Sequence, residues 1–327
     1  MNMSKSDSHK PMVNVIIPAY NAGRWLPDCL RSLLRQSYKS WRAIVIDDGS
    51  TDSTARIVQE FREKDSRIEL VNRPHEGVSA ARNKGLEHAD SRWILFLDAD
   101  DSLHPRALKL LLQTANSTKA QIVVPRQHYG EIPDRFPSIH SLNPKVIDSK
   151  TALKKLLSRR GIEASMSGTL YLRKLFEEPY SLPFRRGRYE DLDLGYRIFE
   201  RAQTIALLPA VLYYYRRHEG SFIRSLSPER FDVLDVTDRI YMHFRGTPLA
   251  KAAEDRRFGA HFNILMLLYS SREIEPAIEK RCLEVIKTSR NNSLRYSGVR
   301  LKNRVGALLA YGGRPMLKLL ARINPQR

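Results

Sequence analysis

The stretch RWILFLDADD, residues 92–101, joins a run of apolar residues to three carboxylates that lie within four positions. A helical pattern, HPRALKLL, follows from residue 104. Apolar runs of this kind are typical of strands buried on both faces of a sheet. Like charges at the end of such a strand repel one another unless a positive group lies among them. The stretch therefore predicts a buried strand that delivers its carboxylates to a site for a cation.

The same alternation of apolar runs and helical patterns extends over residues 13–125. We expect strands at 13–17, 41–46, 68–71, 92–97 and 121–124, and helices at 24–37, 52–64, 77–89 and 104–117. Strands that alternate with helices at this spacing indicate βα units. The pattern predicts an α/β fold with a mostly parallel central sheet and helices on both faces.

The second half of the chain has a different pattern. Residues 126–150 are rich in proline and polar groups, and we expect a long irregular connection there. Helical patterns resume at 150–158 and 190–202, and 204–222 is expected to be a strand with a basic tail. Beyond Ser227 the pattern is helical to the end of the chain.

Composition narrows the function classes. The 327 residues carry a formal net charge of +19, which favours polyanionic partners such as nucleic acid, acidic lipid, phosphorylated substrates or anionic glycans. Cys29 and Cys282 lack zinc-site spacing and are expected to be reduced core residues. No apolar run approaches the roughly 20 residues of a membrane-spanning helix, and the start MNMSKSDSHKPM lacks the apolar stretch of a signal peptide. We therefore expect a cytoplasmic protein.

Two aspartate clusters follow two of the expected strands, Asp47–Asp48 and Asp98–Asp101. The carboxyl ends of parallel strands share one edge of a sheet, so the clusters are expected to share one crevice. Asp98 and Asp100 project to the same side of an extended segment and form a hard oxygen site suited to Mg²⁺ or Mn²⁺. Asp101 or Ser102 is expected to cap the next helix. The alternative for each cluster is a turn with solvated charges.

The segment GVSAARN, residues 77–83, places Arg82 in the first turns of an expected helix. A helix start carries positive potential suited to phosphate. The alternative is that Arg82 only neutralises a neighbouring aspartate.

Taken in order, VNVIIPAYN, DDGSTD, HEGVSAARNKGLEHA and RWILFLDADD resemble the opening of a family 2 inverting glycosyltransferase of the GT-A fold, of the bacterial cell-surface glycan type. The resemblance continues more loosely through RYEDLDLGYRIF and LYYYRRHEGSF, and covers about residues 13–222. It implies a flexible N-terminus at residues 1–12 and a GT-A domain at 13–225. The domain consists of a nucleotide-sugar-binding half at 13–125 and an acceptor-binding half at 126–225. A helical, basic region follows at 226–327.

The resemblance also implies roles for individual donor-side residues. In PAYN, Pro18, Ala19 and Tyr20 correspond to the nucleotide base pocket, and in DDGS, Asp48 is the first candidate for a uracil or ribose contact, with Asp47 beside it. In DAD, Asp98 and Ala99 correspond to the ribose or sugar contact. Asp100 corresponds to the ligand of Mn²⁺ or Mg²⁺, and Arg82 helps to hold the donor.

On the acceptor side, the resemblance assigns the catalytic base to Asp191 of YEDLDL, with Glu190 as the alternative. Asp191 shares a helical stripe with Leu194 and Ile198, at the edge of buried surface, whereas Asp193 is expected on a solvated polar face. In RRHEGS, His218 corresponds to a metal ligand, and Ser221 and Arg217, or Arg216, correspond to diphosphate contacts. The alternative for His218 is a surface histidine in a basic loop.

The implied reaction moves a sugar from a nucleoside-diphosphate sugar, with UDP as the expected nucleotide, to a hydroxyl of a glycan or lipid-linked acceptor in polysaccharide or lipopolysaccharide synthesis. The enzyme would be a metal-dependent hexosyl- or N-acetylhexosaminyltransferase. The sequence departs from the family pattern at SMSGTLYLRKLF, residues 165–176, where Ser167 and Gly168 stand near the position of a tryptophan. That segment meets the acceptor in relatives, so acceptor identity does not transfer.

No acidic residue follows Glu284, whereas lysines, arginines and apolar residues alternate to the end of the chain. Basic amphipathic helices of this kind bind anionic lipid surfaces, which predicts peripheral attachment to the inner face of the cytoplasmic membrane. The alternative is that these helices pack on the core or on a second subunit.

Three other classes compete with a glycosyltransferase. A nucleic-acid-binding protein fits the charge, but no RNA- or DNA-binding motif is present and the acidic residues lie in the expected cleft, so we expect no nucleic acid. A non-catalytic nucleotide-sugar sensor would have lost the base, yet YED is intact. A nucleotidyltransferase would carry a lysine in a glycine-rich loop after the first strand, and IIPAYNAGRW has none.

Overall fold

The computed structural model describes residues 12–139, 142–179, 181–217, 228–271 and 275–323. The chain forms two compact units. We call Met1–Ser149, Ser165–Arg186 and Arg197–Glu219 the sheet unit, and Lys150–Ala164, Gly187–Tyr196 and Gly220–Arg327 the helical unit. Two segments of the expected 13–225 domain therefore belong to the helical unit. The expected flexible N-terminus, 1–12, lies outside the described residues except for Met12.

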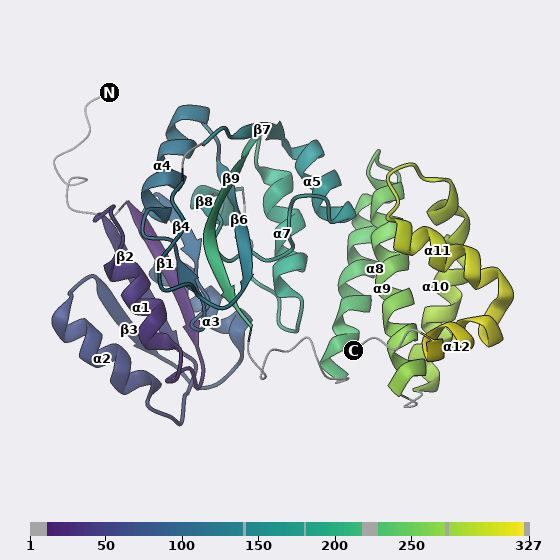
Figure 1. The fold of residues 1–327 in the computed structure, drawn as a ribbon, viewed down its shortest axis with the longest axis horizontal. Helices are drawn as coiled ribbons and strands as arrows, with labels where there is room; N and C mark the ends of the chain where they lie inside the picture. Colours follow the sequence, from purple (N-terminus) through teal and green to yellow (C-terminus); the bar gives the residue numbers. More distant parts are fainter. Residues whose placement is uncertain (1–11, 140–141, 180, 218–227, 272–274, 324–327) are drawn as a thin grey trace. The chain divides into compact units, whose positions relative to one another are not determined.

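The first half of the sheet unit follows the expected βα pattern (Figure 1). Parallel pairing gives the strand order β3-β2-β1-β4. The elements are β1 (Val13–Ala19), α1 (Leu26–Leu34), β2 (Trp41–Asp47), α2 (Thr54–Lys64), β3 (Ile68–Asn72), α3 (Val78–His88) and β4 (Trp93–Phe96). This half confirms the parallel α/β interpretation, with helix ends at the expected bounds or up to three residues inside them.

The second half of the sheet is mixed, and continues the order as β8-β6-β9-β5 with β7 on β9. Among the described strands of this half, β6 and β9 pair in parallel and the other strand pairs are antiparallel. The elements are β5 (Ser102–Leu103), α4 (Ala107–Thr118), β6 (Ile122–Gly130), β7 (Lys145–Asp148), β8 (Leu170–Leu172), α6 (Lys174–Glu177) and β9 (Thr204–Arg216). The expectation of an irregular connection over 126–150 is wrong at both ends, because β6 continues to Gly130 and β7 pairs with β9.

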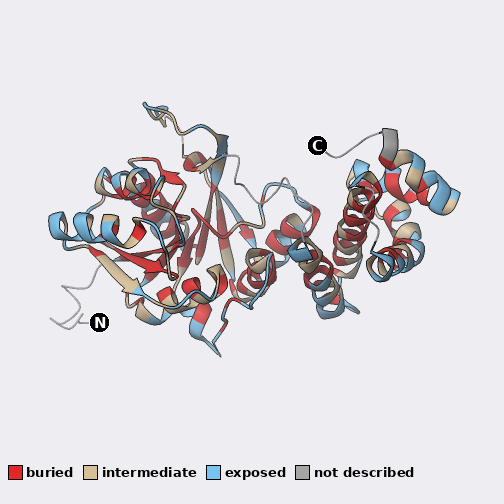
Figure 2. Cartoon of the chain, turned by 90° about the horizontal axis from the view of Figure 1, so that it is seen from below, coloured by how far each residue is buried: buried red, intermediate tan, exposed pale blue. Residues whose placement is uncertain are grey.

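Helices cover both faces of the parallel half. The side chains of Val13, Val15 and Ile17 join a buried cluster with the apolar faces of α1 and α4. The alternate side chain, Ile16, packs on the other face against α3 at Gly85. Figure 2 shows the buried residues running along the strands and along one side of the surrounding helices. This two-sided burial is why the strands are continuous apolar runs.

The helical unit, drawn in green to yellow for its C-terminal part in Figure 1, packs around one central helix, α9. Its elements are α5 (Ser149–Ser158), the start of α7 (Glu190–Arg201), η3 (Pro228–Phe231), α8 (Asp232–Phe244), α9 (Ala250–Ser271), α10 (Pro276–Arg295), α11 (Leu301–Leu309), η4 (Ala310–Gly312) and α12 (Gly313–Ile323). Helices α8, α10, α11 and α12 all contact α9. Within the described ranges, no helix combines the length and apolarity needed to cross a bilayer.

The two cysteines lie one in each core. Cys29 on α1 and Cys282 on α10 are both fully buried, and neither is in a disulfide. Their expected role as small core residues is confirmed.

Candidate functional site

The carboxyl ends of β1, β2 and β4 meet at one edge of the sheet. Ala19 at the end of β1 pairs with Asp47 at the end of β2, and the Asp48 N–H donates to the Ala19 carbonyl at 2.8 Å. On the other side of β1, the Leu97 N–H donates to the Ile16 carbonyl at 3.0 Å, directly before the DADD segment. The fold thus brings PAYN, DDGS and DADD together.

Asp48 is buried and fully engaged by its own unit. Its carboxylate accepts from Arg73 Nη1 at 2.7 Å and from the Gly77 N–H at 2.7 Å, and lies 2.9 Å from His75 Nδ1. These contacts fix the segment that leads into α3. Asp48 therefore holds the loop that leads into α3, and its role as a nucleotide contact stays a prediction.

Asp47 is the less engaged of the pair. It is also buried, and within the described chain it accepts a single hydrogen bond, from the Ser50 N–H at 3.3 Å. Asp47 thus keeps more capacity than Asp48 to accept a hydrogen bond from a ribose or base, although the sequence made Asp48 the first candidate for that contact.

An aromatic platform stands beside this pair. The Tyr20 ring stacks on the His75 ring with centroids 4.0 Å apart and an angle of 24° between the planes. Tyr20 is 48% exposed, so the platform is open to solvent. Pro18 is half-buried and Ala19 buried at the end of β1, directly before it.

Asp98 is neutralised by a guanidinium. Arg82, buried on α3, donates from Nη2 to Asp98 Oδ1 at 2.9 Å, and the Ser167 hydroxyl donates to Asp98 Oδ2 at 3.0 Å. The Arg82 guanidinium lies over the Phe184 ring, 5.4 Å from its centroid. Of the two sequence interpretations of Arg82, neutralisation of an aspartate is observed.

Asp101 is buried among carboxylates, which favours its protonated form. Burial, followed by the charges of Asp98 and Asp100, raises the pKa of Asp101 to about 9. Its carboxyl contacts the buried Tyr213 hydroxyl and accepts from the Arg216 N–H at 2.8 Å. The expectation that Asp101 or Ser102 caps the next helix is wrong. Helix α4 begins at Ala107, and its N-cap is Arg106 without a side-chain hydrogen bond.

The repulsion within DADD is therefore relieved by Arg82 at Asp98 and by the raised pKa of Asp101, and the third carboxylate of the segment is Asp100. Arg216 lies against this residue, since its Nε donates to the Asp100 carbonyl at 2.9 Å and its Nη2 pairs with Asp28 Oδ2 at 3.1 Å. Arg217, the predicted diphosphate contact, lies exposed with its guanidinium 5.9 Å from the Tyr129 ring centroid. Of Arg216 and Arg217, Arg216 therefore lies closer to DADD.

The described residues contain no group of three or more His, Cys, Asp or Glu side chains arranged to hold a metal. Mg²⁺ and Mn²⁺ sites in nucleotide enzymes need only one or two carboxylates, because substrate phosphates and water supply the other ligands. Asp100, half-buried beside the buried Ala99, meets that requirement. The predicted metal ligand His218 and the diphosphate contact Ser221 lie outside the described residues.

The YED segment begins α7 in the helical unit. Glu190 and Asp191 are half-buried in its first turn. The expectation of a solvated Asp193 is wrong, because Asp193 is 1% exposed and pairs with Arg239 Nε of α8 at 2.9 Å. Asp193 faces α8, which the helical pattern of α7 alone does not reveal.

Several residues that shape the site were not identified from the sequence. Ser167 binds Asp98 and Tyr213 binds Asp101, and both come from segments far away in the chain. Gly168 explains the departure at SMSGTLYL. It has a φ of +77°, and a Cβ there would lie 2.5 Å from Tyr213 Cδ2. The tight contact with Tyr213 excludes any larger residue at this position.

Comparison with known proteins agrees with this geometry. The sequence model of the family described as "Glycosyl transferase family 2" matches residues 14–178. Glycosyltransferase GlyA of Streptococcus pneumoniae is 31% identical over 221 residues, which are 65% of this chain and 31% of GlyA. The chain thus spans less than a third of that relative.

Two solved structures share the fold. S. aureus TarS 1–349 in complex with UDP-GlcNAc has a TM-score of 0.67 at 19% identity, over 95% of this chain and 89% of TarS. The mannosyltransferase PcManGT from Pyrobaculum calidifontis, in complex with GDP-Man and Mn²⁺, has a TM-score of 0.55 at 15% identity, over 98% of this chain and 89% of PcManGT. With the family match over residues 14–178 and the strand-end edge that those residues form, the chain belongs to glycosyl transferase family 2.

Proposed function

We propose that this chain transfers a sugar from a nucleoside-diphosphate sugar to a hydroxyl of a glycan or lipid-linked acceptor. The observation that carries the proposal is the joint placement of Tyr20, Asp47 and Asp100 at one sheet edge of a family 2 chain. Ligands of open α/β sheets bind at the carboxyl ends of the strands. The same edge offers a ring platform and several carboxylates.

The nucleotide would lie against the Tyr20–His75 platform, with Asp47 accepting from the base or ribose. Stacking on an aromatic face suits any nucleobase, and a carboxylate acceptor suits an N–H or O–H donor of the ligand. UDP is the nucleotide we favour, and the TarS complex with UDP-GlcNAc supports that choice. The sugar would be a hexose or N-acetylhexosamine.

A divalent cation, Mn²⁺ or Mg²⁺, would be held by Asp100 together with the donor diphosphate. It would supply Lewis-acid stabilisation of the departing nucleoside diphosphate. The PcManGT complex with Mn²⁺ supports a metal in this fold. Arg216 would add positive charge to the same leaving group, and Arg82 would keep Asp98 oriented.

On the acceptor side, Asp191 would take the proton from the attacking hydroxyl, with Glu190 as the alternative base. One carboxylate acting on the acceptor, without a covalent sugar adduct, gives a single displacement at the anomeric carbon. The anomeric configuration would therefore be inverted.

The acceptor would be presented at an anionic membrane surface. Large apolar side chains are exposed on α11, η4 and α12 among the basic residues of this region, namely Leu301, Val305, Leu308, Tyr311, Met316 and Leu319. We call this set the apolar patch. Exposed apolar side chains beside lysines and arginines suit peripheral binding to acidic lipid. A lipid-linked acceptor in cell-surface polysaccharide synthesis fits this location.

A thermal-shift panel tests the proposal. UDP-, GDP- and dTDP-sugars are each added with Mn²⁺ and with EDTA to the full chain. We expect one nucleotide class to raise the unfolding temperature, and to raise it more with Mn²⁺ than with EDTA, because bound ligand stabilises the folded state. No metal-dependent shift with any donor would contradict the proposal.

A further inference from the structure

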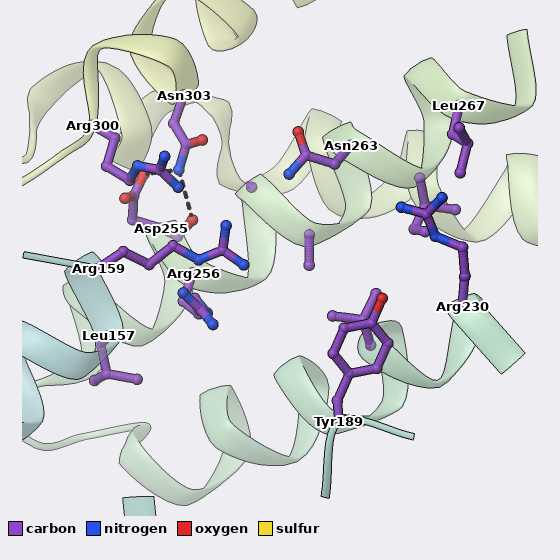
Figure 3. Close-up of a pocket in the computed structure, with 14 residues that line it drawn as sticks. Leu157, Arg159, Tyr189, Arg230, Asp255, Arg256, Asn263, Leu267, Arg300 and Asn303 are labelled. Carbon is purple, nitrogen blue, oxygen red and sulfur yellow. Dashed lines mark hydrogen bonds between the residues drawn. The ribbon is translucent and has the colours of Figure 1, made fainter. Parts of the chain in front are cut away.

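The helical unit contains a cavity of about 360 Å³ whose wall carries four arginines. Arg159 follows α5, Arg230 lies in η3, Arg256 lies in α9, and Arg300 directly precedes α11. Figure 3 shows the guanidinium groups of Arg159, Arg256 and Arg300 gathered at one side of the pocket and Arg230 at the other. We call these four residues the arginine pocket. Its volume is that of a small-ligand site, a class that begins at about 300 Å³.

Arg256 is the most deeply placed of the four. It is 7% exposed, and its Nη1 has no hydrogen-bond partner among the described residues. Burial, together with the positive charges of Arg159 and Arg300, lowers its pKa to about 9. Burial and Arg300 also lower the pKa of Arg159. Burying a guanidinium is costly in free energy unless a counter-ion compensates its charge.

Two carboxylates act on these arginines, since Glu163 raises the pKa of both Arg159 and Arg256 and Asp255 raises that of Arg256, but burial outweighs both in each case. Asp255 is the one acidic residue of the pocket wall, and its carboxylate accepts from Asn303 Nδ2 at 3.1 Å and Ser293 Oγ at 3.3 Å. Burial raises the pKa of Asp255. Across the described ranges, Arg159, Arg256 and Arg300 form no ion pair with a carboxylate. Three guanidinium groups without an ion pair among the described residues, those of Arg159, Arg256 and Arg300, therefore face one carboxyl of the pocket wall that is already engaged.

We propose that the arginine pocket binds a phosphate or diphosphate group of a ligand. Guanidinium forks match the oxygens of phosphate, and a phosphate or diphosphate carries the multiple negative charge that several converging arginines require, whereas one carboxylate carries a single charge. Leu157, Val233 and Leu267 give the pocket an apolar wall for the organic part of the ligand. All these residues belong to the helical unit, whereas the proposed donor residues belong to the sheet unit.

Calorimetric titration of the full chain with pyrophosphate in EDTA tests the proposal, with phosphatidic acid vesicles as a second arm. The test variant is Arg159→Gln, because Arg159 is exposed enough to be changed without loss of the fold. The matched control is Arg295→Gln, an exposed arginine at the end of α10 outside the pocket. We expect Arg159→Gln to weaken pyrophosphate binding at least about 10-fold and Arg295→Gln to weaken it less than about 2-fold.

The two arms identify the source of the phosphate. Loss of vesicle binding in Arg159→Gln as well would assign the site to a lipid phosphate, and unchanged vesicle binding would assign it to a soluble one. Equal losses in both variants, or no saturable binding in either arm, would overturn the proposal. Binding of a glutamate-rich peptide in place of pyrophosphate would overturn it in favour of an acidic protein. Donor-induced thermal shifts should be the same in Arg159→Gln and wild type, which separates this test from that of the proposed transfer.

Discussion

At the scale of single residues, neighbours of the same type take different roles because the fold surrounds them differently. Asp48 is held by Arg73, His75 and the Gly77 N–H, whereas Asp47 accepts one hydrogen bond from the described residues. The sequence placed both at the ligand edge, but their order of importance depends on the 73–77 segment, which only the folded chain brings to Asp48. Asp101 and Asp193 were misassigned for the same reason, since their partners Tyr213 and Arg239 are distant in sequence.

Matched asparagine variants separate the two residues of DDGS. Asp48→Asn removes the buried carboxylate of the two that pair with Arg73, the other being Glu76, so we expect the free energy of unfolding to fall by about 1–3 kcal/mol. Asp47→Asn should change it by less than about 1 kcal/mol but weaken nucleotide binding about 10-fold. Denaturant titrations and nucleotide calorimetry measure both quantities. Stability loss in Asp47→Asn with normal binding would reverse the assignment.

The buried carboxyl of Asp101 predicts a pH-dependent stability. Its pKa is raised to about 9 in the folded protein, while the unfolded side chain titrates near its ordinary 3.8. Between these values unfolding releases a proton, so the contribution of Asp101 to stability falls as pH rises, by at most about 1.4 kcal/mol per pH unit. The asparagine in Asp101→Asn does not titrate. The unfolding temperature of this variant should therefore rise relative to that of the wild type between pH 5 and pH 8. A difference that is constant over this range would show that Asp101 is ionised in the folded state.

At the scale of elements, hydrophobic periodicity was sufficient to predict strands and helices wherever burial on two faces determines which residues are apolar. The strands and helices of the parallel half were predicted because their apolar runs and stripes are set by local pairing and packing. The ends of 126–150 were not, since β6 beyond Pro125 and the polar strand β7 depend on pairing with β9, some 60 to 80 residues later, roughly. Gly168 was likewise noticed only as a departure from the family pattern.

Helix α3 carries Arg82 to the site, and Gly85 sets how closely it packs on β1. A Cβ at Gly85 would lie 2.3 Å from Ile16 Cγ2. We expect Gly85→Ala to destabilise the protein by about 1–3 kcal/mol and, by displacing Arg82, to weaken donor binding. Denaturant unfolding and donor titration are the measurements.

Gly195→Ala is the control for that variant. Gly195 lies inside α7, and a Cβ there would find no atom closer than 3.9 Å. The alanine should stabilise the protein by about 0.5–1 kcal/mol, because glycine is a poor helix former. If Gly85→Ala were as stable as Gly195→Ala, α3 would not be positioned by this contact.

At the scale of the whole molecule, the division into units crosses the order of the sequence. Lys150–Ala164 and Gly187–Tyr196 belong to the helical unit although they lie inside the stretch that resembles the family. The sequence alone assigns each segment to the same domain as its neighbours in the sequence. In the folded chain, these two segments instead belong to the unit that contains α8 and α9. The family and fold class were predicted correctly, and the role of each site residue stays a prediction.

The apolar patch gives a test of membrane attachment that leaves the fold intact. Leu301, Leu308 and Leu319 are 76%, 62% and 51% exposed, so changing all three to Ser should leave the unfolding temperature unchanged. We expect binding to anionic vesicles to weaken about 10-fold or more, since burying each leucine in lipid contributes about 1.5–3 kcal/mol. Met242→Ser, which changes a 59% exposed residue on α8, is the control. Unchanged vesicle binding of the triple variant would contradict membrane attachment through the apolar patch and would favour a protein partner for it.

The central claim is sugar transfer from a nucleotide donor with Asp191 as the base. The measurement is the rate at which the full chain releases nucleoside diphosphate from its preferred donor with Mn²⁺, in wild type and Asp191→Asn, alongside donor affinity. We predict release at least about 100-fold slower in Asp191→Asn, because a general base contributes at least that much, with donor affinity within about 2-fold of wild type. Release at the wild-type rate by Asp191→Asn, or none by the wild type from any donor, would contradict the account.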